Sequence, residues 1–223
     1  MHKAPVIITL ALSVLLMGAD IKAKQILKIP TTEKILYLTF DDGPHPRVTP
    51  KVLKTLKRHS IKATFFLLGR NCERYPKIVK QIQEEGHDIQ NHSYDHADFT
   101  LLSNEQIDTD IRQSQALLES LIDKRPEFVR VPYGRITPRV YKHLKKSFKE
   151  VIKWNIDTKD WDIENNSLGI STYIINHVGP GSILLFHDNN NNCLQTLAST
   201  IPALKDLGYI FHHLSAGLET PPN

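Results

Sequence analysis

The chain has 223 residues and a formal net charge of +4, a length that fits one domain of ordinary size with a sizeable core. Its Lys and Arg residues are isolated, with neither a basic block nor an interleaved aromatic stripe, which argues against a nucleic-acid-binding protein. The two cysteines, Cys72 and Cys193, form no C-x-x-C pair, so a cysteine redox or metal site is not indicated; whether they form a disulfide stays open.

The first residues carry the pattern of an export signal. His2 and Lys3 precede an apolar run over residues 6–17, and small and polar residues follow. The run is too short for a comfortable membrane span and is typical of a secretory signal peptide. We therefore expect a signal peptide over residues 1–23, without a defined cleavage site, and a secreted or periplasmic domain over residues 24–223 without stable membrane insertion. An uncleaved N-terminal membrane anchor is the alternative. The oligomeric state is not indicated.

After this segment, short apolar runs rich in β-branched and aromatic residues alternate with longer amphipathic segments. Such an alternation is typical of βαβ units around a largely parallel sheet. The expected strands cover residues 35–40, 63–68, 87–90, 128–131, 151–156, 182–186 and 209–214. The expected helices lie between them, including residues 75–85, 167–178 and 197–207.

Helix starts are marked by their usual capping residues. Thr-Pro pairs at residues 49–50 and 137–138 predict an N-cap followed by proline in the first turn. Ser103 and Gln106 have the spacing of a capping box and open a long helix.

Acidic, basic and imidazole side chains gather where the expected strands end. In a (β/α) barrel the carboxyl ends of all strands meet at one face, where active sites are built. Residues that are far apart in the sequence are therefore expected to converge. The candidates are Asp41, Asp42, His92, His96, Arg130, Asp157, Asp160 and His187.

Asp42, His92 and His96 have the composition of a metal site. Two imidazoles four residues apart and one carboxylate suit a catalytic zinc ion with open positions for water and substrate. The same ligands also suit non-haem iron, so the spacing does not choose the metal. The alternatives are an Asp-Asp-Gly-Pro turn whose carboxylates only cap backbone N–H groups, and a histidine pair with ordinary hydrogen bonds.

The remaining residues fit the roles of a metal-assisted acyl hydrolase. With Asp42 on the cation, Asp41 is free to act as a base on a water molecule, and Arg130 is suited to orient it. His187 is placed to protonate the leaving group, with Asp157 holding its ring. No G-x-S-x-G turn is present, so a serine nucleophile is not indicated.

Five stretches of the chain, in this order, resemble the motifs of the polysaccharide deacetylase family, which is the NodB-homology domain or family four of the carbohydrate esterases. The resemblance covers about residues 35–214. The motifs are Thr-Phe-Asp-Asp-Gly-Pro at 39–44, His-Ser-Tyr-Asp-His at 92–96, Arg-Val-Pro-Tyr-Gly at 130–134, Asp-Thr-Lys-Asp-Trp at 157–161 and Leu-Phe-His-Asp at 185–188.

The resemblance implies a single-domain, irregular (β/α) barrel and the same roles for the acid, base and metal-binding residues. It also implies that the backbone N–H of Tyr133 helps to stabilise an oxyanion and that Trp161 and Leu185 line the pocket for the acetyl methyl group. The implied cofactor is Zn²⁺, with Co²⁺ as another suitable ion. The chain departs from the family pattern at Val131, where proline is more common.

We therefore predict a zinc-dependent hydrolase that removes N-acetyl groups from hexosamine residues of a glycan such as peptidoglycan, chitin or poly-N-acetylglucosamine, releasing acetate. An esterase acting on O-acetyl groups of a polysaccharide such as acetylxylan is one alternative. A glycan-binding relic without catalysis is another, and the presence of Asp41, Arg130 and His187 argues against it.

Overall fold

The computed structural model describes residues 25–162 and 164–219. The predicted signal peptide and its alternative, an uncleaved anchor, lie outside these residues, and the boundary of the catalytic domain at residue 24 stays a prediction. Among the described residues, no helix is long and apolar enough to cross a membrane.

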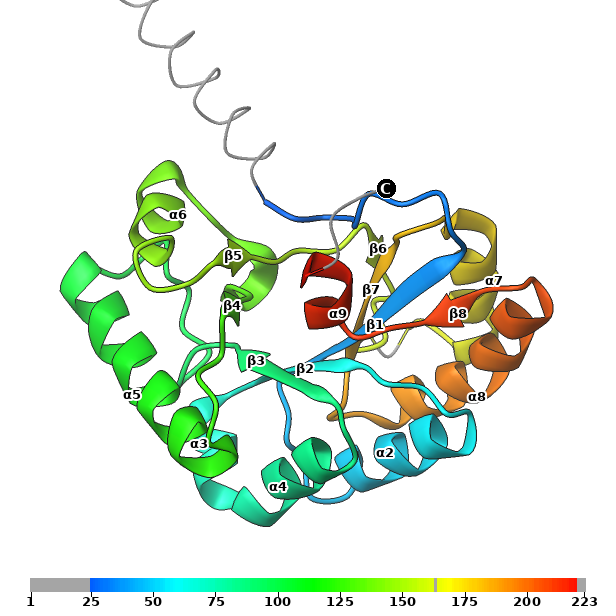
Figure 1. The fold of residues 1–223 in the computed structure, drawn as a ribbon, viewed down its shortest axis with the longest axis horizontal. Helices are drawn as coiled ribbons and strands as arrows, with labels where there is room; N and C mark the ends of the chain where they lie inside the picture. Colours follow the sequence, from blue (N-terminus) through cyan, green and yellow to red (C-terminus); the bar gives the residue numbers. More distant parts are fainter. Residues whose placement is uncertain (1–24, 163, 220–223) are drawn as a thin grey trace, which may run out of the picture.

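The described strands form one eight-stranded sheet in which every strand pairing is parallel (Figure 1). The strand order is β5-β4-β3-β2-β1-β7-β6, and β8 pairs with the beginning of β1. This parallel α/β architecture confirms the predicted fold class. The strands are β1 (Ile35–Asp41), β2 (Thr64–Leu67), β3 (Asp88–Asn91), β4 (Phe128–Val129), β5 (Glu150–Val151), β6 (Ile156–Asp157), β7 (Ile183–His187) and β8 (Ile210–Phe211).

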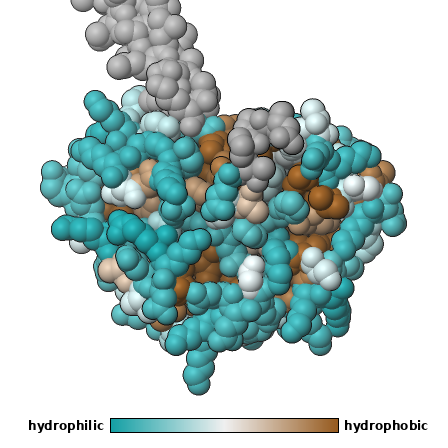
Figure 2. Space-filling view, viewed as in Figure 1, coloured by the Kyte–Doolittle hydropathy of each residue, from teal (hydrophilic) through white to brown (hydrophobic). Residues whose placement is uncertain are grey.

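Most helices lie along the outside of the curled sheet, and α9 lies close to its centre (Figure 1). The side of the molecule in Figure 2 is mainly hydrophilic, with hydrophobic side chains showing between the outer segments. The helices are α2 (Thr49–Arg58), α3 (Gly69–Arg74), α4 (Pro76–Glu84), α5 (Asn104–Ile122), η1 (Pro132–Gly134), α6 (Pro138–Leu144), α7 (Ser167–His177), α8 (Asn191–Asp206) and α9 (Leu214–Glu219).

Strand β1 separates two apolar clusters by the alternation of its side chains. Leu36, Leu38 and Phe40 belong to the large cluster that also contains residues of α2, α4 and α8. Tyr37 belongs to an inner cluster with Leu214 of α9. Because successive side chains of a strand point to opposite faces, Asp41 continues the Tyr37 side of the strand. The first carboxylate of the motif is therefore directed to the inside of the barrel.

The expected strand over residues 151–156 is wrong, because this segment contains two short strands. β5 pairs with β4 at one edge of the sheet, and β6 pairs with β7 at the opposite edge. The residues between them cross from one edge to the other. Their position is stabilised by Asn155, whose side chain accepts from the N–H of Ile183 at 2.8 Å and donates to Ser182 Oγ at 3.0 Å. The partner strands, and not local β-propensity, decide this break.

Other boundaries also differ from the sequence expectations. Val48, and not Thr49, is the N-cap of α2, since the Thr49 hydroxyl bonds to Asp188 and accepts from the N–H of His45. Helix α8 begins inside the asparagine run, with Asn190 as its cap. The short helices α3 and α9 are not in the sequence prediction. The capping box at the start of α5 and the Thr137 cap of α6 are confirmed.

Candidate active site

Strand β1 ends at the two carboxylates and places them differently. Asp41 is the last residue of the strand, is buried, and lies in register with His187 of the neighbouring strand β7. Asp42 has a left-handed backbone with φ of 71°, which turns the chain away from the strand direction. Since its side chain does not continue the alternation of the strand, both carboxylates reach the same region.

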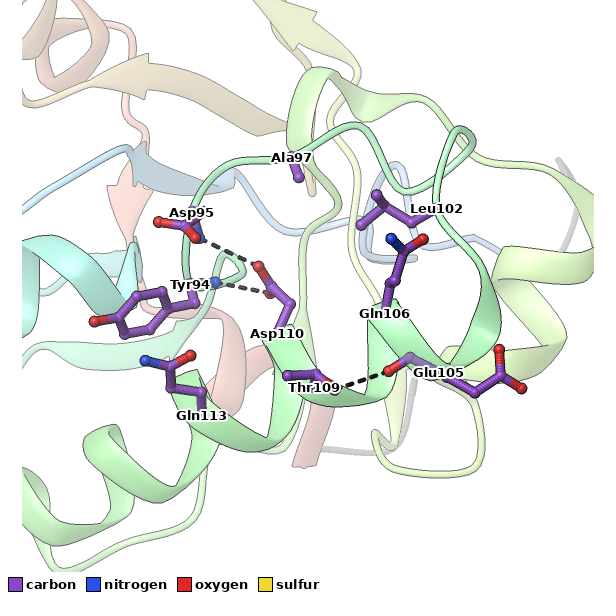
Figure 3. A pocket seen from close by; sticks show the side chains of 9 residues that line it. All are labelled: Tyr94, Asp95, Ala97, Leu102, Glu105, Gln106, Thr109, Asp110 and Gln113. Atoms are coloured by element: carbon purple, nitrogen blue, oxygen red, sulfur yellow. Dashed lines mark hydrogen bonds between the residues drawn. The ribbon is translucent and has the colours of Figure 1, made fainter.

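The loop after β3 carries the two histidines and is held by helix α5. Ser93 and His96 both have positive φ, and the N–H of His96 donates to Ser93 Oγ at 2.9 Å. The carboxylate of Asp110 accepts from the N–H of Tyr94 at 2.8 Å and from that of Asp95 at 3.2 Å (Figure 3). Tyr94 and Asp95 of the loop and Asp110 of α5 also line the pocket in Figure 3. The bonds to Asp110 fix the backbone between His92 and His96.

Asp42, His92 and His96 bring three ligand atoms within 4.8 Å of one another. Oδ1 of Asp42 lies 3.5 Å from Nε2 of His92 and 3.3 Å from Nε2 of His96. Nδ1 of His92 donates to the carbonyl of Arg130 at 2.8 Å, so the Nε2 lone pair faces the carboxylate. The predicted convergence of these residues is therefore present in the structure.

The environment of Asp42 fits a cation. Its Oδ1 is buried and has no hydrogen-bond partner among the described residues. Burial alone would raise the pKa of Asp42, but contact with His92 and the charges of His92, His96 and His187 hold this pKa well below its usual range. Two imidazole nitrogens and one ionised carboxylate that share a space of this size are suited to hold a divalent transition metal.

Arg130 fixes the second carboxylate. Its Nη1 donates to Oδ1 of Asp41 at 2.7 Å and to Thr39 Oγ1 at 2.9 Å, while Nη2 donates to the carbonyl of Lys153 at 2.9 Å. The guanidinium group is fully buried and lies over the ring of Phe66, 4.1 Å from its centroid. The other oxygen of Asp41 lies 3.6 Å from Nε2 of His92, so it faces the histidine cluster.

The partner of His187 is Asp160, and the prediction that Asp157 holds this ring is corrected. Nδ1 of His187 donates to Oδ1 of Asp160 at 2.8 Å, and the N–H of His187 donates to Oδ2 at 2.9 Å. Asp157 instead accepts from the N–H of Lys159 at 3.0 Å. Lys159 has a left-handed backbone, with φ of 50°, and the turn that it forms brings the later carboxylate to the imidazole.

Asp160 changes the acidity of the imidazole. Burial favours the neutral ring, but the hydrogen bond and charge of Asp160, together with the charges of Asp41 and Asp42, raise the pKa of His187 from 6.5 to about 9. Pairing with Asp160 therefore favours the protonated ring at neutral pH, and Nε2 is the nitrogen that is not bonded to Asp160.

Of the three predicted substrate contacts, Tyr133 follows β4 within η1, Trp161 follows β6 and Leu185 lies within β7. Tyr133 has positive φ, and its ring lies against that of His96 with 4.5 Å between centroids. Trp161 is 58% exposed, whereas Leu185 is buried in register with Thr39. Val131, the departure from the family pattern, is buried in an apolar cluster. The contacts of Tyr133, Trp161 and Leu185 with substrate stay predictions.

Both cysteines have free, buried thiols. Burial raises the pKa of the Cys72 and Cys193 thiols well above the usual value. Neither thiol therefore has the character of a nucleophile.

At the carboxyl ends of its strands, the barrel carries a carboxylate held by arginine, an imidazole paired with aspartate and a cluster of three ligands. These features are typical of a (β/α)-barrel hydrolase. Comparison with known proteins gives the family. The sequence profile described as "Polysaccharide deacetylase" matches residues 28–151, more than half of the chain. The chain belongs to the polysaccharide deacetylase family, and the prediction of family is confirmed.

Similar proteins extend this match beyond the profile. A peptidoglycan-N-acetylglucosamine deacetylase of Bacillus cereus is 38% identical over 86% of this chain and 70% of its own length. A chitooligosaccharide deacetylase of Azorhizobium caulinodans is 34% identical over 85% of this chain and 97% of its own length. The crystal structure of the Bc1960 peptidoglycan N-acetylglucosamine deacetylase, in complex with a substituted benzamide, has a TM-score of 0.84 at 33% identity, covering 92% of this chain and 97% of that one.

Proposed function

We propose that the chain is a zinc-dependent deacetylase that hydrolyses the N-acetyl group of hexosamine residues in a glycan and releases acetate. The arrangement of Asp41 and His187 carries this proposal, because a carboxylate held by Arg130 and an imidazole paired with Asp160 lie in register on adjacent strands, at the strand ends that carry the ligand cluster. The names of the relatives, which specify peptidoglycan N-acetylglucosamine and chitooligosaccharides, support the substrate class.

Asp42, His92 and His96 would hold the metal. When bound, Zn²⁺ supplies Lewis acidity and lowers the pKa of a water molecule at an open position. The hydrogen bond from His92 Nδ1 to the carbonyl of Arg130 orients one of these ligands.

Asp41 would act as the general base. Its Oδ1 is occupied by Arg130 and its Oδ2 faces the cluster, so Oδ2 is the oxygen that takes a proton from the attacking water. The guanidinium group prevents rotation of the carboxylate, because it is itself held by Thr39 and by the carbonyl of Lys153.

His187 would act as the general acid. As the carbon–nitrogen bond breaks, its Nε2 gives a proton to the departing amine, and the water oxygen remains on the carbonyl carbon as acetate. The backbone N–H of Tyr133 would donate to the oxyanion, while Trp161 and Leu185 would enclose the methyl group. Groups that are oriented before the substrate binds would lower the barrier of these steps.

The raised pKa of His187 favours amide over ester hydrolysis. An amide nitrogen is a poor leaving group unless it is protonated, and a strongly held imidazolium ion is available at neutral pH to supply that proton. Acetate release from chitin oligomers, peptidoglycan, poly-N-acetylglucosamine and acetylxylan by the zinc-loaded protein compares the two reactions. We expect release from the N-acetylated glycans, and release from acetylxylan alone would contradict the proposal.

Asp41→Asn tests the mechanism. The amide cannot take the proton, so turnover should fall at least about 100-fold while bound zinc, measured by mass spectrometry of the metal, stays near the wild-type amount. Asp206→Asn is the matched control, because Asp206 is an exposed carboxylate at the end of α8. Full turnover in Asp41→Asn would exclude the base role.

We further propose that the protein acts outside the cytoplasm. The export pattern of residues 1–23 supports this location, as do relatives named for peptidoglycan, a cell-wall polymer. Determination of the N-terminus of the protein from the cell envelope or medium would distinguish a cleaved signal peptide from an uncleaved anchor.

A further inference from the structure

A second cavity, of about 360 Å³, adjoins the acid side of the proposed site. Asp160, the partner of His187, and Trp161 both line it. The other walls come from the segment before α7, the start of α7 and the first turn of α8, and α7 and α8 pack against each other. Six of the lining residues carry side-chain amides. They are Asn165, Asn166, Asn190, Asn191, Asn192 and Gln195.

Hydrogen bonds fix most of these walls. Oδ1 of Asn166 caps α7 through the N–H of Gly169 at 2.8 Å, and Oδ1 of Asn190 caps α8 through that of Cys193 at 2.9 Å. Nδ2 of Asn192 donates to the carbonyl of Asn165 at 2.8 Å and ties the two segments together. The cavity is therefore formed before any ligand enters, which lowers the entropic cost of binding.

Two amides remain available to a ligand. Among the described residues, the exposed side chains of Asn191 and Gln195 have no hydrogen-bond partner. Each offers two N–H donors and a carbonyl acceptor. Trp161 adds an exposed aromatic surface. The charged lining group, Asp160, is buried and already bonded to His187, so the cavity presents neutral polar groups and one aromatic face.

Neutral donors and acceptors beside an aromatic ring match the chemistry of a sugar, which has hydroxyl groups around its edge and an apolar ring face. We propose that this amide pocket binds a second, uncharged sugar unit of the glycan, adjacent to the unit that is deacetylated. Asn191 and Gln195 bond its hydroxyl or acetamido groups, and Trp161 contacts both units. This inference rests on the proposed function, since it places the reacting unit beside His187.

The pocket in Figure 3 has a different character. Three acidic residues, Asp95, Glu105 and Asp110, line it, and Asp110 is committed to the backbone of the histidine loop. Gln113, an exposed amide in that pocket, provides a matched control for the amide pocket.

Binding tests the proposal without turnover. Calorimetry on the Asp41→Asn protein with chitopentaose should give a Kd that rises about tenfold when Asn191→Ala and Gln195→Ala are added, and stays within twofold when Gln113→Ala is added. An unchanged Kd in the double variant, or no binding of chitopentaose to the Asp41→Asn protein, would overturn the pocket assignment. Weakened binding of only a carboxylate-bearing glycan would overturn its neutral character.

Kinetics separate this proposal from the proposed function. In the active protein, the double variant should lower the ratio of kcat/KM for chitopentaose to that for the disaccharide about tenfold, whereas Gln113→Ala should leave the ratio unchanged. Absence of acetate release from every glycan would refute the deacetylase, while the calorimetric result would still decide the pocket. An unchanged ratio in an active double variant would refute the pocket alone.

Discussion

Replacement of Asp160 by asparagine should remove the charge that keeps His187 protonated while preserving the shape of the side chain. The pKa of His187 lies at about 9 instead of 6.5, a difference that corresponds to about 3 kcal/mol. Burial lowers this pKa, while the charges of Asp41 and Asp42 still raise it, so the pKa of His187 in Asp160→Asn should fall from about 9 toward 6.5. The alkaline limb of the pH profile should therefore move to lower pH, by up to about two pH units.

The profile of kcat/KM reports the free enzyme and is the measurement of choice. Asp157→Asn is the control, because the Asp157 carboxylate accepts from the N–H of Lys159, whereas the imidazole of His187 bonds to Asp160. A limb that moves in Asp157→Asn and stays in Asp160→Asn would refute the assignment of the partner.

The same pair makes stability depend on pH. The folded pKa of His187 is raised, so its contribution is complete below pH 6.5 and is lost as the pH rises through about 9. Urea unfolding of the metal-free proteins measures this effect. Over this pH range, the free energy of unfolding of the wild type should fall by up to about 3 kcal/mol more than that of Asp160→Asn. Equal pH dependence in the two proteins would contradict the coupling.

Two further substitutions probe the ligand cluster and the turn beneath it. His92→Ala should lose both bound zinc and activity, because two ligands remain of three, and unchanged zinc content by metal analysis would place the metal elsewhere. Gly43→Ala should destabilise the fold by about 1–3 kcal/mol in urea unfolding, because the added Cβ would clash with Oδ1 of the buried Asp188. An unchanged unfolding midpoint would show that the Asp188 side chain can move away without cost.

The convergence of the site could be predicted because parallel topology makes strand ends neighbours. Asp41 and His187 are far apart in the sequence, yet adjacent strands place them in register. The apolar runs that define β1 and β7 are clear in the sequence, so their terminal polar residues are clear as well.

The partner of His187 could not be predicted in the same way. Asp157 ends a strand and Asp160 does not, so strand position favours Asp157. The choice depends on the left-handed turn at Lys159, a conformation that a lysine rarely adopts and that no local pattern marks. The signal that was present is the second aspartate three residues later, directly before Trp161.

The crossing between β5 and β6 was also beyond a local interpretation. Residues 151–156 have the composition of one strand, but in the structure the chain crosses here from β5 at one edge of the curled sheet to β6 at the other edge. The Arg130 side chain is buried against this crossing segment, where it donates to the carbonyl of Lys153. This contact joins residues that are distant in the sequence, so no local pattern predicts it.

Arg130 serves two purposes at once, and this affects how related sequences should be interpreted. Its guanidinium group orients Asp41 and also bonds to Lys153 in the crossing segment, within the barrel. A descendant that no longer catalysed the reaction would still be selected to keep this arginine for folding. Its retention in a relative is therefore weak evidence of activity, and Arg130 argues less strongly against a non-catalytic relic than its presence in the sequence alone indicates. Asp41 and His187 together are the more informative markers of a working enzyme in this lineage.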